Sequence, residues 1–147
     1  MGYSVDKVAG DAIYLNKEQV ARFESLLDSV EINTGIGHIS WCEPIDKLRE
    51  NHEGRELVFK VLTDYGFIAE LNPYEDGIIV YSWGGDKIGS SWDPMWDALG
   101  EVASEKVVWL IRGEDNEFWA EVVAPGEGRR QVGIDLDDLI QKAYETL

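Results

Sequence analysis

The stretch FIAELNPYEDGIIVYSW, residues 67–83, decides the fold of this chain. Apolar and β-branched residues fill its two ends, Phe67–Leu71 and Ile78–Trp83, and turn-forming residues concentrate between them. Strand-forming runs on either side of such a cluster are typical of a β-hairpin. We therefore predict two antiparallel strands joined by the turn 72–77. Gly84-Gly85-Asp86, directly after the second strand, predicts a further turn.

A second segment with the same pattern lies further along the chain. Val107–Ile111 and Phe118–Val123 are apolar runs separated by Gly113-Glu114-Asp115-Asn116, which predicts another hairpin. Three shorter segments are also expected to be strands: residues 8–15, Ile39–Cys42 and Gln131–Ile134.

Apolar residues at helical spacing surround the hairpins. Asn16 with Gln19 three residues later forms a capping box, which predicts a helix over residues 17–30. Another helix is expected to begin at Asp93-Pro94 and to bury Met95, Trp96, Leu99 and Val102. Further helices are predicted after Pro44, over Leu57–Tyr65 with Gly66 as the cap, and over Asp137–Tyr144.

This order of elements predicts an α+β fold. We expect an antiparallel sheet of about five strands with helices packed mainly on one face. A length of 147 residues suits one globular domain over residues 1–147, with a core of its own.

Charge is the outlying feature of the composition. Asp and Glu total 29 against 13 Lys and Arg, which gives a net charge of −16. Such a field repels nucleic acid and anionic membranes, and it favours basic proteins. We therefore expect a basic protein partner, with no direct binding of nucleic acid or membrane. A purely solubilising role for the acidic residues stays open.

The sequence also bears on location. No apolar run approaches the roughly 18 residues that a membrane span needs. The start MGYSVDKVAGD has no basic segment followed by an apolar one, and Cys42 is the only cysteine. We expect a cytoplasmic protein.

No catalytic motif is recognisable. The chain contains no P-loop, dinucleotide fingerprint, nucleophile elbow or HExxH pattern. His38, Cys42 and His52 do not have the spacing of a zinc module, and the glycine-rich run 84–91 lacks P-loop spacing. We predict a protein that is not an enzyme and uses no cofactor or metal. A hydrolase with a pair of carboxylates remains an alternative.

One acidic pattern stands above this background. Asp93, Asp97, Glu101 and Glu105 recur at intervals of four from the start of the predicted fourth helix. Residues four apart are neighbours on a helix, about 6 Å apart along its axis, so these carboxylates would form a stripe. The stripe is interpreted as a docking surface for a basic partner, and a solvated helix face is the alternative.

Tryptophan is unusually frequent, with six residues in the chain. Trp96 and Trp109 lie in apolar patterns and are expected in the core. Trp119 shares its strand face with Glu117 and Glu121, because side chains alternate along a strand. An exposed Trp among acids can anchor an Arg-rich protein surface. Burial of Trp119 beneath a helix is the alternative.

The predicted partner-binding set joins the acidic residues to two indoles: Trp92, Asp93, Asp97, Glu101, Glu105, Glu117, Trp119 and Glu121. We predict a non-enzymatic acidic binding protein, of inhibitor or immunity type, that neutralises a basic protein such as a nucleic-acid enzyme. Nucleic-acid mimicry would be the extreme form of this activity. The alternatives are the hydrolase and a small-molecule or carbohydrate-binding module that stacks ligands on Trp83, Trp92 or Trp119.

Overall fold

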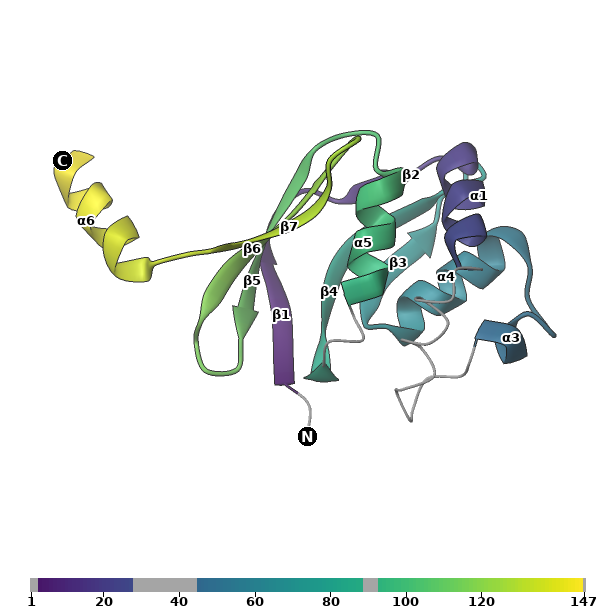
Figure 1. Cartoon of the computed structure of the whole chain (residues 1–147), viewed down its shortest axis with the longest axis horizontal. Coiled ribbons are helices and arrows are strands. Elements are labelled where there is room, and N and C mark those ends of the chain that lie inside the picture. The colour runs from purple at the N-terminus through teal and green to yellow at the C-terminus, as the bar shows by residue number, and fades with distance from the viewer. Residues whose placement is uncertain (1–2, 28–44, 89–92, 147) are drawn as a thin grey trace.

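The computed structural model describes residues 3–27, 45–88 and 93–146, and Figure 1 shows their arrangement. The strands are β1 (Tyr3–Ala9), β2 (Ile13–Leu15), β3 (Phe67–Leu71), β4 (Ile78–Ile88), β5 (Val107–Gly113), β6 (Phe118–Ala124) and β7 (Gly128–Gly133). The helices in these segments are α1 (Lys17–Leu26), α3 (Ile45–Leu48), α4 (Gly54–Asp64), α5 (Asp93–Val102) and α6 (Leu136–Thr146).

The strands form one antiparallel sheet, which confirms the α+β prediction. Their order is β2-β4-β1-β5-β6-β7, and β3 pairs with the remaining edge of β4. Strand β4 is long enough to serve three neighbours: residues 78–80 pair with β2 and β3, whereas its far end pairs with β1. Both predicted hairpins, β3–β4 and β5–β6, are present.

Within the described residues the sheet has seven strands, where about five were expected. One reason is that the predicted strand 8–15 is divided between β1 and β2. Gly10 between them has a φ of +132°, a backbone conformation open to glycine but strained for other residues. A Cβ at Gly10 would also lie 2.5 Å from the carbonyl oxygen of Val108. Any larger residue at this position would therefore clash with β5.

The turn predicted at Gly84-Gly85-Asp86 is wrong, because these residues continue β4. Gly84 pairs with Asp6 and Gly85 with Val5, both in β1. A Cβ at Gly84 would lie 3.1 Å from the carbonyl oxygen of Val5. Glycine therefore permits a close approach of two strands at this point instead of a reversal of the chain.

The helix ends follow the local sequence signals. The Asn16 side chain accepts a hydrogen bond from the Gln19 amide at 2.9 Å, and the Gln19 side chain accepts one from the Asn16 amide at 2.7 Å. The predicted capping box is thus confirmed. Helix α4 is followed by Gly66 at a φ of +88°, as its predicted cap. The end of the predicted helix 17–30 and the predicted strand 39–42 lie outside the described residues.

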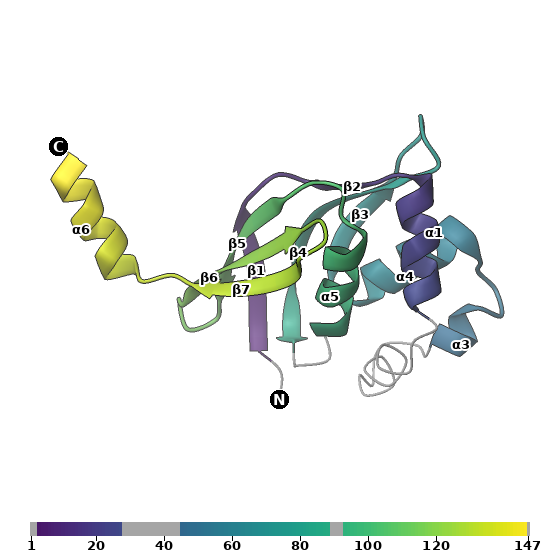
Figure 2. The same cartoon turned by 45° about the horizontal axis from the view of Figure 1, so that its top comes forward.

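An aromatic cluster holds α5 to the sheet. The ring of Trp96 lies 5.2 Å from that of Phe67, 5.4 Å from Trp83 and 5.3 Å from Trp109, measured between centroids. Trp96 and Trp109 are buried, as predicted. Its three aromatic neighbours belong to β3, β4 and β5. This one side chain therefore packs α5 against three strands of the sheet. Helix α5 also contacts α1, β6 and β7 (Figure 2).

Helix α6 is set apart from the rest of the fold. It projects beyond the end of the sheet, away from the other labelled helices (Figures 1 and 2), and its residues are all exposed. Within the described segments, no helix combines the length and apolarity that crossing a membrane requires.

Gly100 lets α5 approach the turn between β6 and β7, and this contact can be tested. A Cβ at Gly100 would lie 2.6 Å from the carbonyl carbon of Gly128. Alanine usually stabilises a helix relative to glycine by about 1 kcal/mol. We predict the opposite sign here: Gly100→Ala lowers the free energy of unfolding in urea by about 1–3 kcal/mol, because it overpacks the contact.

The control for this test is Gly133→Ala, because no atom lies within 4 Å of the added Cβ. This variant is expected to keep the wild-type free energy of unfolding. A stabilising effect of Gly100→Ala would contradict the close contact between α5 and the turn.

Candidate functional site

Helix α5 separates apolar from acidic side chains. Its predicted core residues are buried, namely Met95, Trp96, Leu99 and Val102. Asp97 and Glu101 are exposed and lie one helical turn apart. The same helix therefore supplies the centre of the core and two neighbouring carboxylates at the surface.

The predicted stripe of four acids on one helix is wrong at Glu105. Helix α5 ends at Val102, and the exposed Glu105 lies in the bend that leads into β5. The Gln19 side chain donates a hydrogen bond of 2.9 Å to the carbonyl oxygen of Val102, which satisfies a helix end that would otherwise lack a partner. Trp92 and the side chain of Asp93 lie outside the described part of the chain.

A third carboxylate joins α5 from another element. Glu101 and Glu127 line the same hollow of about 380 Å³, with Arg22 of α1 at its border. Glu127 belongs to the β6–β7 turn, which the contact at Gly100 brings against α5. We call Asp97, Glu101 and Glu127 the acidic surface. The sequence marks residues 125–128 as a turn, but nothing local indicates which helix the turn meets.

Glu121 is not part of an exposed acidic face, and that expectation is wrong. The residue is 1% exposed. Its carboxylate accepts hydrogen bonds from the Arg129 guanidinium at 2.8 and 3.0 Å, from Gln131 at 2.8 Å and from the Trp119 indole at 3.0 Å. Glu121 is therefore an internal residue that links β6 to β7.

The inward direction of this strand face agrees with the alternative expectation, burial of Trp119 beneath a helix, and not with an exposed acidic face. Trp119 and Glu121 do share a face, and they stand opposite Ile111 and Trp109 of the core. A glutamate can lie on this face because Arg129 neutralises it, and a buried charge is tolerated when paired and fully hydrogen-bonded. The alternation of apolar and polar residues alone favours the opposite orientation.

Trp119 is partly buried and packs against the core. Its indole N–H is already used by Glu121. Glu117 is exposed just before β6, whereas Glu127 follows that strand, so the two lie at opposite ends of β6. The structure thus gathers Asp97 and Glu101 with Glu127, and it separates them from Glu117.

Arg129 connects the buried network to the acidic surface. Its guanidinium Nη1 lies 4.0 Å from the Asp97 carboxylate, while its side chain is only 11% exposed. One cation is therefore shared between the internal Glu121 and the exposed Asp97. This arrangement ties the position of α5 to that of β7.

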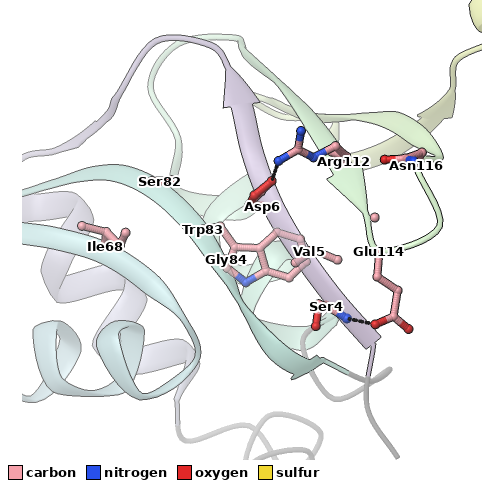
Figure 3. Close-up of a pocket in the computed structure, with 11 residues that line it drawn as sticks. Ser4, Val5, Asp6, Ile68, Ser82, Trp83, Gly84, Arg112, Glu114 and Asn116 are labelled. Carbon is pink, nitrogen blue, oxygen red and sulfur yellow. Dashed lines mark hydrogen bonds and ion pairs between the residues drawn. The ribbon is translucent and has the colours of Figure 1, made fainter.

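A larger hollow of about 560 Å³ lies where β1, β4 and β5 meet (Figure 3). Its charged groups are paired: Arg112 lies 2.9 Å from Asp6, and Glu114 accepts a hydrogen bond of 3.3 Å from the Ser4 amide. Trp83 borders the hollow but is only 3% exposed. Its ring is therefore not the open stacking platform that a carbohydrate-binding module would require.

Metal ligands do not cluster in the part of the chain that the structure describes. Over residues 3–27, 45–88 and 93–146, no group of three His, Cys, Asp or Glu side chains could hold a metal ion. His38 and Cys42 lie outside these ranges.

Comparisons with protein-family models, with curated proteins and with solved structures find no match to this chain.

The internal role of Glu121 predicts a large loss of stability when its charge is removed. Glu121→Gln leaves the mostly buried Arg129 without its main partner, and we expect the free energy of unfolding to fall by about 3–5 kcal/mol. Glu127→Gln, at an exposed turn position, removes the same charge and should leave stability unchanged. Thermal and urea unfolding of both variants measure the difference, and equal stabilities would show that the buried pair is unimportant.

Proposed function

We propose that this chain is an acidic binding protein, of inhibitor type, that neutralises a basic protein through the acidic surface. The observation that carries this proposal is the meeting of Glu101 and Glu127 at one hollow, beside the exposed Asp97 on the same helix. A lysine or arginine side chain entering the hollow would lie near two carboxylates. Arg22 at its border offsets part of this charge.

Long-range electrostatics supports the same partner. A net charge of −16 attracts a cationic protein before contact and raises the rate of association. Exposed charges are screened over about 10 Å at 0.1 M salt, so such binding weakens as salt increases. Complementary charge also disfavours acidic partners and nucleic acid.

The acidic surface stands on a rigid support. Trp96 fixes α5 to the sheet, and the absence of a side chain at Gly100 lets the helix pack closely against the β6–β7 turn. A preorganised surface loses less conformational entropy when it binds than a flexible loop does. Rigidity therefore favours a docking role for these carboxylates over a merely solvating one.

The length of α5 limits how closely its acidic residues can imitate nucleic acid. Because Glu105 lies beyond the end of α5, the regular row of acids that would imitate a phosphate backbone is shortened. We therefore propose neutralisation by a local patch rather than nucleic-acid mimicry.

We also propose a cytoplasmic location, because a chain with one cysteine has no internal disulfide to maintain.

A capture experiment with charge-matched variants tests the role of the acidic surface. The first variant combines Asp97→Asn, Glu101→Gln and Glu127→Gln. The control combines Glu75→Gln, Asp76→Asn and Asp115→Asn, which neutralise three exposed acids in the β3–β4 and β5–β6 turns. Both variants lose the same formal charge.

Immobilised wild-type protein should retain a basic protein from native lysate at low salt and release it at high salt. We expect the control to retain the same protein and the acidic-surface variant to lose at least about tenfold in affinity, as removal of several central contacts does. Equal retention by both variants would assign binding to the total charge and would contradict a specific site.

A further inference from the structure

Helix α6 carries an apolar stripe that is open to solvent. Leu136, Leu139, Ile140 and Tyr144 recur at helical spacing, and they are 42%, 50%, 56% and 73% exposed. The opposite side of the helix is polar, with Asp137, Asp138, Gln141, Lys142 and Glu145. Isolated helices shorter than about 12–15 residues are marginal in water, so an 11-residue helix needs packing on its apolar side.

The connection to β7 directs α6 away from its own sheet. The Ile134 amide donates a hydrogen bond of 3.3 Å to Phe118, which continues the pairing of β6 with β7. Asp135 caps the helix, since its side chain accepts from the amides of Asp137 at 3.0 Å and Asp138 at 3.2 Å. The backbone of Ile134 thus continues the sheet pairing up to the residue that caps α6.

A second apolar face lies open on the same chain. Leu110, Ala120 and Val132 stand in one row across β5, β6 and β7, and Val108 pairs with Val122 in the next row. Residues directly opposite each other share a face of the sheet, and this face points away from Trp109. Val108 is 48% exposed and Val132 is 50% exposed. We call these five residues the outer face.

Basic residues border the outer face on two sides. Arg112 stands opposite Phe118 on one side, and Arg130 stands opposite Val122 on the other. Both arginines are exposed. The first turn of α6 is acidic, with Asp137 and Asp138. Arg112 is already paired with Asp6, and Asp138 is paired with Lys142 of the same helix, so the charge complementarity between the two surfaces rests on Arg130 and Asp137.

We propose that α6 docks on the outer face of a second copy of this chain, and that the second copy returns the contact. A two-fold exchange covers both apolar surfaces of each chain at once. The dimensions agree, because a helix about 16 Å long and 10 Å wide covers three strands spaced about 4.8 Å apart. Exchange provides two such contacts, which brings the dimer towards the roughly 1,200 Å² that stable interfaces bury.

Sedimentation equilibrium of the full chain tests the proposal over a range of micromolar concentrations. High salt is required, since two copies that each carry −16 repel one another until the charge is screened. The expected mass is twice the 16.6 kDa of one chain. A monomeric mass at every concentration would overturn the proposal.

A pair of variants on α6 separates the apolar stripe from the general charge. Ile140→Glu places a carboxylate in the stripe, and Gln141→Glu adds the same charge to the polar side. Both positions are exposed, so the fold should persist in each variant. We expect Ile140→Glu to raise the dimer dissociation constant by about 100-fold, through loss of a buried apolar contact on each side. Gln141→Glu should change it less than about threefold, and equal effects would overturn the proposal.

A variant of the sheet identifies the surface that receives the helix. Val108→Glu should abolish the dimer although α6 is unchanged. Val132→Glu on the edge strand β7 replaces this variant if Val108→Glu fails to fold. A dimer that survives substitution of the outer face would mean that the α6 stripes pair with each other, which would overturn the proposed exchange. Because high salt weakens capture of a basic protein but reduces the repulsion between two chains that each carry −16, failure of one proposal is distinguishable from failure of the other.

Discussion

The packing of Trp96 is the interaction on which the rest of the structure depends. This indole lies between Phe67, Trp83 and Trp109, so it joins α5 to β3, β4 and β5 together. Strand β4 pairs with β3 along its first part and with β1 along its last part, and α5 packs where the pairing changes. Every exposed group on α5 takes its position from this buried contact. The acidic surface is therefore a consequence of how the core is closed.

Glu101 and Glu121 show why an acidic composition does not define a site. Both are glutamates on elements packed against the same core, yet one is exposed and the other is sealed inside. The difference is Arg129, whose guanidinium meets Glu121 in two hydrogen bonds and also lies near Asp97. Removing a carboxylate from water is costly unless a cation and further donors replace the solvent. Glu121 has these partners and links β6 to β7, whereas Glu101 and Glu127 are exposed at the surface.

Local signals predicted the elements well, and long-range contacts decided where the prediction failed. The capping box at Asn16, both hairpins and the apolar side of α5 follow from residues close together in the chain. Gly84 and Gly85 extend a strand because β1 approaches them, and Glu121 faces inward because Arg129 of β7, which pairs with Val123, reaches its carboxylate. Glu127 joins the acidic surface through Gly100. A single sequence does not state any of these pairings.

Hydrogen exchange of the chain, alone and with the basic protein that we propose it binds, tests whether α5 and the turn 125–128 form the contact. We expect slower exchange of backbone amides in α5 and in the turn 125–128 upon binding, because these segments carry the proposed contact. Exchange in the β5–β6 turn should be the same in both states. Protection confined to the outer face of β5–β7, with α5 unchanged, would contradict binding through the acidic surface.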